Sequence, residues 1–139
     1  MSELSVRLEL LKTNLAAMYP DRIVTRDLKD FSLRKKPDLE IGIYTIISKG
    51  LSDFNSPAQL VLLEGTHGIL LVGQIELPES ADPSEVEDAE NEMWDEVKAF
   101  IQTPGAGLCP LDPVSMLQSQ QIDHPFGWIA VELSFRYFD

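Results

Sequence analysis

Cysteine and long apolar runs are both scarce in this sequence. A single cysteine, Cys109, stands among 139 residues, so no disulfide forms within the chain, and a lone thiol suits a reducing cytosol. No apolar run approaches the roughly 20 residues that a membrane-spanning helix needs. The first residues, MSELSVRLELL, carry acids and lack the basic start and apolar block of a secretory signal. We therefore expect a soluble protein of the cytosol.

Basic residues are scarce as well. Eleven Lys and Arg stand against 23 Asp and Glu, which gives a formal net charge of −12. This charge argues against binding to nucleic acid or anionic membranes, because both need a basic surface. It suits a protein that stays soluble at high concentration, or one that lets DNA pass without adhering. The length and the 44% hydrophobic content fit one globular domain with its own core.

The two signs of charge are concentrated in different segments. Six of the eleven basic residues lie between Arg22 and Lys36, and nine acids with no base among them lie between Glu79 and Glu96. A basic segment and an acidic segment are compatible with pairing between copies of the chain. The alternative is that both are solvated surfaces, because exposed ion pairs contribute little. The candidate interface residues are Arg26, Lys29, Phe31, Arg34, Lys35, Lys36, Glu85, Asp88 and Glu92.

The clearest helix is predicted from Asp82 to Thr103. Asp82 is a good N-cap, Pro83 fits the first helical position, and Glu85 completes the spacing of a capping box. Apolar residues recur every three or four positions, so one stripe faces a core while the opposite face is acidic. The stripe consists of Val86, Ala89, Met93, Val97, Phe100 and Ile101.

Another helix is predicted from Ser2 to Tyr19, on the apolar face made by Leu4, Leu8, Leu11, Leu15 and Met18. Alternation of apolar and polar residues predicts the strands, and a tight hairpin is expected at Gly65–Gly68 because glycine supplies positive φ. The polar, basic stretch 27–38 is predicted as a long arm, and residues 49–58 as a loop. The predicted strands cover residues 22–26, 39–48, 59–64, 69–77, 114–122 and 128–138.

These elements predict an α+β fold over residues 1–139. The economical arrangement is a mainly antiparallel sheet of four to six strands, with the two principal helices packed on one face. The first half of the strand 69–77 is apolar on both sides, so we expect both faces of the sheet to be covered there. A neighbouring subunit is one candidate for the second cover.

Catalytic and metal-binding patterns are weak. Cys109 has two possible histidine partners, His67 and His124, but it sits between apolar neighbours without a recognisable motif, which is typical of inert packing. Glycines at 105 and 107 do not open a helix, so they do not predict a phosphate-binding loop. We therefore expect no catalytic residues and no cofactor.

One arrangement of acids is also compatible with a metal site. Glu85, Asp88 and Glu92 fall on one face of the acidic helix, and three such carboxylates can hold a hard cation. A solvated helix surface explains the same pattern more simply. We expect no metal.

Four features taken together resemble a known family. They are the amphipathic helix containing Leu4 to Met18, the hairpin at Gly65–Gly68, the acidic helix Asp82–Thr103, and the aromatic-rich ending WIAVELSFRYFD. In their order and character they are similar to the tail-terminator, or tail-completion, proteins of long-tailed bacteriophages. The resemblance covers nearly the whole chain, and it rests on layout because that family has no diagnostic motif.

The resemblance implies a structural virion protein and no enzyme. It implies a homo-oligomeric ring, typically a hexamer, at the head-proximal end of the tail tube, assembled in the host cytoplasm. The ring would end tube polymerisation, contact the tube protein and a head-tail connector or neck protein, and let DNA pass through its lumen without specific binding.

Two other classes of function are consistent with the residues. An acidic adaptor or immunity-type protein would bind a basic protein partner through the acidic helix. An enzyme would need a cleft lined by His67, His124 and Cys109.

Overall fold

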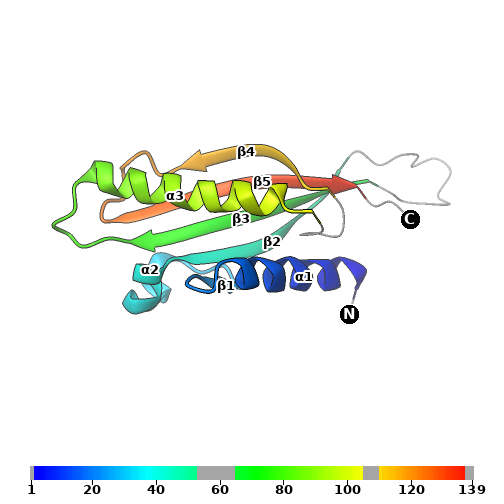
Figure 1. Ribbon diagram of the computed structural model, residues 1–139, viewed down its shortest axis with the longest axis horizontal. Helices are drawn as coiled ribbons and strands as arrows, with labels where there is room; N and C mark the ends of the chain where they lie inside the picture. Colours follow the sequence, from blue (N-terminus) through cyan, green and yellow to red (C-terminus); the bar gives the residue numbers. More distant parts are fainter. Residues whose placement is uncertain (1, 53–64, 105–109, 137–139) are drawn as a thin grey trace.

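The computed structural model describes residues 2–52, 65–104 and 110–136 (Figure 1). Its centre is a five-stranded sheet in the order β1-β2-β3-β5-β4, in which β1 is parallel to β2 and the other neighbours are antiparallel. The prediction of an α+β fold is confirmed. In chain order the elements are α1 (Glu3–Met18), β1 (Ile23–Thr25), the 3-10 turn η1 (Phe31–Leu33), α2 (Lys36–Ile41), β2 (Ile43–Ser52), β3 (Thr66–Glu76), α3 (Pro83–Gln102), β4 (Asp112–Gln118) and β5 (Phe126–Arg136).

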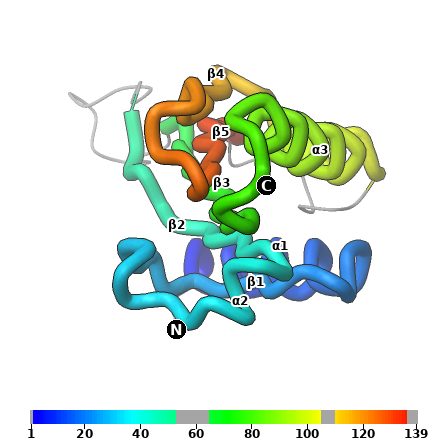
Figure 2. The backbone as a smooth tube through the Cα atoms, turned by 90° about the vertical axis from the view of Figure 1, so that its left-hand side faces the viewer, coloured from blue at the N-terminus to red at the C-terminus, as the bar shows by residue number. Residues whose placement is uncertain are grey.

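The two long helices, α1 and α3, pack on the same face of the sheet, as expected (Figures 1 and 2). Their apolar stripes and the inward side chains of the central strands form one core. Each buried aliphatic or aromatic side chain there contributes about 1.5–3 kcal/mol. The core includes Leu8, Leu11 and Leu15 of α1, Met93, Val97 and Phe100 of α3, Ile69 and Leu71 of β3, and Ile129, Val131 and Leu133 of β5.

Both helices begin where their sequences predict. The side chain of Ser2 accepts a hydrogen bond from the amide of Ser5 at 3.1 Å, which satisfies a free donor of the first turn of α1. The predicted capping box of α3 is present, and the amide of Asp82 donates to Glu85 Oε2 at 3.0 Å. The two predicted helix ranges are therefore confirmed to within one residue at each end.

The strand expected from residue 39 begins later, at Ile43. Residues 36–41 instead form the short helix α2, with Pro37 in its first turn, where a missing N–H costs nothing. Gly42 ends this helix with φ of +97°, a conformation that glycine adopts without strain. The prediction was wrong for residues 39–42, because Pro37 and Gly42 bound a short helix in which Leu39 is buried and Ile41 is exposed, as residues two apart on a helix are expected to be.

The predicted loop from residue 49 and the hairpin turn at Gly65–Gly68 are wrong where the structure describes them. β2 continues to Ser52, and its last residues pair with β3, for example Gly50 with Gly68. A Cβ atom on Gly68 would lie 3.1 Å from the Cβ of Lys49, so this glycine permits close approach of the strands and marks no turn. The strand predicted over residues 59–64 lies outside the described residues.

The last two strands are shifted slightly from their predicted ranges. β4 covers 112–118 and ends before the predicted 122, because Gln120 and Gln121 adopt positive φ values of 58° and 66°. β5 begins at Phe126, two residues earlier than predicted, and its last predicted residues lie outside the described chain. It is paired along its whole described length with β3, and with β4 on its other side, so it is an interior strand of the sheet.

The basic stretch 27–38 is not an extended arm. It contains η1 and the start of α2, and it folds across the sheet face opposite to α1 and α3 (Figure 2). The ring of Phe31 lies 4.9 Å from that of Phe126 on β5, and Arg34 Nε donates to Gln74 Oε1 of β3 at 3.3 Å. The prediction of an unstructured excursion was wrong, because these contacts offset the loss of chain entropy. We call residues 27–36 the basic segment below.

The expectation that both faces of the sheet are covered holds only in part. The basic segment covers one end of the second face. Farther along, Ile47, Leu70 and Val72 on this face are partly exposed.

Candidate functional site

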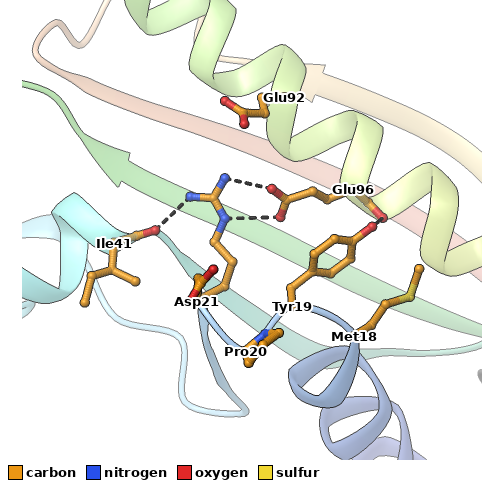
Figure 3. A pocket seen from close by; sticks show the side chains of 8 residues that line it. Met18, Tyr19, Pro20, Asp21, Ile41, Glu92 and Glu96 are labelled. Carbon is orange, nitrogen blue, oxygen red and sulfur yellow. Dashed lines mark hydrogen bonds and ion pairs between the residues drawn. The ribbon is translucent and has the colours of Figure 1, made fainter.

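A pocket of about 320 Å³ opens between the end of α1, the start of β1, the end of α2 and the middle of α3 (Figure 3). The pocket brings together segments that are more than 70 residues apart in the chain. It is at the small end of the roughly 300–1,000 Å³ of typical ligand pockets, which suits an occupant of side-chain size. Its lining is Met18, Tyr19, Pro20, Asp21, Arg22, Ile41, Glu92 and Glu96.

An ion pair between Arg22 and Glu96 forms one wall. Arg22 Nε and Nη2 donate to the two carboxylate oxygens of Glu96 at 3.1 and 2.9 Å, a bidentate arrangement, and Nη1 donates to the carbonyl of Ile41 at 2.7 Å. The side chains are only 14% and 17% exposed. Burial by itself lowers the pKa of Arg22, but the hydrogen bonds and charge of Glu96 outweigh it, and the pKa is raised. Arg22 is therefore charged and fully engaged.

Two tyrosines complete the network. The hydroxyl of Tyr44 donates to Glu96 Oε1 at 2.8 Å, and that of Tyr19 donates to the backbone carbonyl of Glu96 at 3.0 Å. Burial raises the pKa of both hydroxyls, and the neighbouring Glu96 raises it further. Both groups are thus neutral hydrogen-bond donors at physiological pH. The carboxylate of Glu96 accepts three hydrogen bonds, two from Arg22 and one from Tyr44.

Gly42 is a requirement of this network. A Cβ atom there would lie 2.5 Å from Arg22 Nη1, closer than real Cβ contacts come. Its positive φ and the proximity of the guanidinium both exclude a larger residue.

The open side of the pocket is acidic. Arg22 and Glu96 neutralise each other, so Asp21 and Glu92 leave the pocket with an excess of two negative charges. Among the described residues, neither Asp21 nor Glu92 takes part in an ion pair. Such a rim, next to exposed Met18 and Ile41, fits a cationic group on an apolar stem.

Most predicted basic interface residues contact their own domain. Arg26 pairs with Glu9 at 3.1 Å, and Lys36 with Glu76 at 3.6 Å. Arg34 and Phe31 are engaged on β3 and β5 as described above. Lys29 and Lys35 are exposed and form no ion pair within the described part of the chain.

The predicted acidic interface residues also fall into two groups, one used within the domain and one exposed. Glu85 is used in the capping box of α3, whereas Asp88 and Glu92 are exposed, and only Glu92 lines the pocket. Within one chain the basic segment and α3 lie on opposite faces of the sheet. The predicted basic and acidic sets are therefore not brought together inside a single molecule.

Sequence reasoning predicted the apolar stripe of α3 but missed the acidic residues that this helix turns inward. Glu90 is completely buried, and its Oε2 accepts hydrogen bonds from the amide of Trp128 at 2.8 Å and from the hydroxyl of Ser119. Its position four residues after Val86 and three before Met93 puts it on the apolar stripe, and that spacing was the available signal. No local pattern indicated the pairing of Arg22 with Glu96, since 74 residues separate them.

The two histidines proposed for an enzyme cleft lie far apart. His67 is near the start of β3, and His124 lies just before β5, beside the other end of β3. The nine residues between His67 and Glu76 span about 30 Å of strand. No single cleft holds both histidines, and Cys109 lies outside the described residues.

Within the described ranges, no three His, Cys, Asp or Glu side chains are grouped so that they could hold a metal ion. None of the helices described there has the length and apolar character required to cross a membrane.

No known protein family model matches this chain, and no curated protein sequence matches it either.

Proposed function

We propose that this protein is a structural virion protein that forms a ring at the head-proximal end of a phage tail tube. In this role it ends tube polymerisation and provides the surface on which the filled head docks. The observation that carries the proposal is that the acidic helix α3 and the basic segment lie on opposite faces of the sheet (Figure 2). α3 has a formal charge of −6, because seven acids stand against Lys98, whereas residues 27–36, across the sheet, have a charge of +2, because four bases stand against Asp27 and Asp30. Opposite charges on opposite sides suit head-to-tail contacts between copies.

The layout of the chain supports the same proposal. An amphipathic first helix, a long acidic helix and an aromatic-rich final strand occur in the order typical of tail terminators. The net charge of −12 suits a ring through which DNA passes, because an acidic wall repels the phosphate backbone. The proposed partners are further copies of the chain, the tube protein and a head-tail connector or neck protein.

Tube assembly in the presence of the protein tests this function. The tube protein encoded in the same genome is polymerised with and without the purified chain, and the tubes are examined by negative-stain electron microscopy. We expect a cap at one end of each tube and shorter tubes as the protein is added. Tubes that grow to the same lengths with bare ends would refute the proposal.

The exposed acids of α3 and the acidic pocket also fit a second function, that of an acidic adaptor or immunity-type protein. Such a protein would mask a cationic partner with its helix surface. It would remain a monomer and bind one basic protein with a one-to-one stoichiometry. The mass of the protein alone and in complex separates this function from the ring.

A further inference from the structure

The outward side of the basic segment carries an unusual combination of residues. Leu33 is 70% exposed and Leu28 is 48% exposed, and Lys29 and Lys35 lie close to them in the chain. We call these four residues the segment tip. Asp27 and Asp30 are exposed beside Leu28 and Lys29, so the cationic part of this surface is the run Arg34–Lys36, which follows the exposed Leu33.

Contacts with β3 and β5 fix the backbone that carries the segment tip. Phe31 packs on Phe126, and Arg34 donates to Gln74 and, at 2.8 Å, to the carbonyl of Asp27. The side chain of Gln74 in turn donates to the carbonyl of Lys29 at 3.0 Å. Because the backbone is fixed by these contacts, the tip loses little further entropy on binding.

The pocket carries the complementary combination. Asp21 and Glu92 supply two negative charges, and Met18 and Ile41 supply exposed apolar surface. Arg22 does not oppose a second cation strongly, because its guanidinium is already neutralised by Glu96. The pocket thus offers apolar walls for a side-chain stem and carboxylates for its ammonium group.

We propose that the pocket binds the segment tip of a second copy of this chain, with Lys35 directed at Glu92 and Asp21. The contact joins two copies, because the tip is anchored on the sheet face opposite to the helix that supplies Glu92. Different surfaces of the two copies meet, so the contact repeats head to tail and closes into a ring when the rotation allows. The inference rests on the proposed ring and identifies its subunit contact.

Charge alone does not make this contact strong. An exposed ion pair contributes about 0.2–1 kcal/mol, so burial of the leucines must supply most of the affinity. Charge instead selects the partner surface, because like charges placed together are repelled. Salt should weaken the association without abolishing it.

Reciprocal charge reversal tests the contact. Glu92→Lys reverses the pocket and Lys35→Glu reverses the tip, and each variant alone places like charges against each other at every contact. We expect the dissociation constant for self-association, measured by sedimentation, to rise by about tenfold or more for each variant. An equimolar mixture of the two variants should regain wild-type association. In alternating copies, the unchanged lysine meets the unchanged glutamate at one contact, and the two introduced residues, again of opposite charge, meet at the next.

The charge-reversal experiment has two controls. Glu87→Lys has the same charge change on α3, but Glu87 contacts Gln121 and does not line the pocket, so its association should match wild type. Unchanged melting temperatures show that the variants fold, as expected for exposed positions.

The outcomes separate the contact from the function. If wild type associates and both reversals leave its dissociation constant unchanged, the pocket is not the receptor, although the ring survives. If wild type stays monomeric both alone and with the tube protein, the contact and the proposed function are both wrong. If the equimolar mixture regains wild-type association, the contact is supported. If tubes are then still not capped, only the proposed function is wrong.

Discussion

Glu92 and Glu96 lie one helical turn apart on α3 and line the same pocket, yet they differ in burial and in hydrogen bonding. Glu96 is almost buried and holds Arg22 and Tyr44 through its carboxylate, whereas Glu92 is exposed and forms no ion pair within the described residues. Glu96 therefore supports the fold, and Glu92 is available to a partner. Position along an acidic helix does not reveal this difference; the residues that face each carboxylate decide it.

The basic residues show the same division. Arg22, Arg26 and Arg34 are engaged within the domain, and Lys29 and Lys35 are exposed. The planar guanidinium donates several hydrogen bonds in fixed directions, which suits structural contacts between segments. An ammonium group on a flexible stem is better suited to an exposed surface.

Removal of the Glu96 carboxylate should have the largest effect on stability. Glu96→Ala leaves Arg22 without its bidentate partner in a mostly buried site and removes an acceptor from Tyr44. We expect the free energy of unfolding, measured in urea, to fall by about 3 kcal/mol. Glu92→Ala is the matched control and should change it by less than about 0.5 kcal/mol. Equal losses for the two variants would remove the distinction between these carboxylates.

A methyl group at Gly42 should damage the same network from the backbone side. Gly42→Ala combines strain at φ of +97° with a contact of 2.5 Å to Arg22 Nη1. The expected loss in the free energy of unfolding is about 2 kcal/mol. Gly50→Ala is a suitable comparison, because Gly50 also has positive φ, at +108°, but no atom of the described residues lies within 4 Å of its added Cβ. The smaller loss expected for Gly50→Ala isolates the cost of the contact with Arg22.

Releasing the basic segment should have a moderate effect. Phe31→Ala removes the aromatic contact with Phe126 that anchors the segment, and we expect a loss of about 1.5 kcal/mol and faster proteolysis within residues 27–36. Leu33→Ala, in the exposed tip, should leave both the stability and the rate of cleavage nearly unchanged. A strong loss for Leu33→Ala would show that the tip is part of the fold.

The smallest expected effect is a dependence of stability on pH that comes from the buried side chain of His67. Burial lowers the pKa of His67, and the charge of Arg7 lowers it further. The folded state then binds a proton less readily than the unfolded state, whose histidine pKa is about 6.5. The contribution of His67 to stability should therefore be constant above that pH and decline as the pH falls below it, until the lower folded pKa is reached.

Denaturation in urea between pH 5.5 and 7.5 measures this decline. His67→Phe, which retains an aromatic ring to stack on Phe135, should flatten it. A slope that survives in His67→Phe would assign the dependence to other groups.

Periodicity predicted the parts of this molecule that depend on local sequence. α1, α3 and β5 have a clear apolar repeat, and Asp82 and Glu85 cap α3 as their spacing indicates. Prediction failed at Leu39 and Ile41, whose alternation is typical of a strand, because Pro37 and Gly42 start and end a short helix there. It also failed at Gly65–Gly68, because a glycine that permits close strand packing looks in sequence like a glycine in a turn.

The candidate site was only partly predictable. Glu92 and Lys35 belong to the segments of concentrated charge, and composition is enough to select those segments. Which charges stay available depends on contacts between distant parts of the chain, such as Arg22 with Glu96 and Arg34 with Gln74. The pocket itself arises from the meeting of α1, α2 and α3, which no local pattern encodes.

The mass of the protein in solution tests the central claim, that the outward charges of this domain serve assembly between copies. Sedimentation is followed over protein concentration and at low and high salt, with and without the tube protein of the same genome. We predict an assembly near six copies of 15.6 kDa that weakens as salt rises. A species of 15.6 kDa under every condition, including contact with the tube protein, would contradict the account.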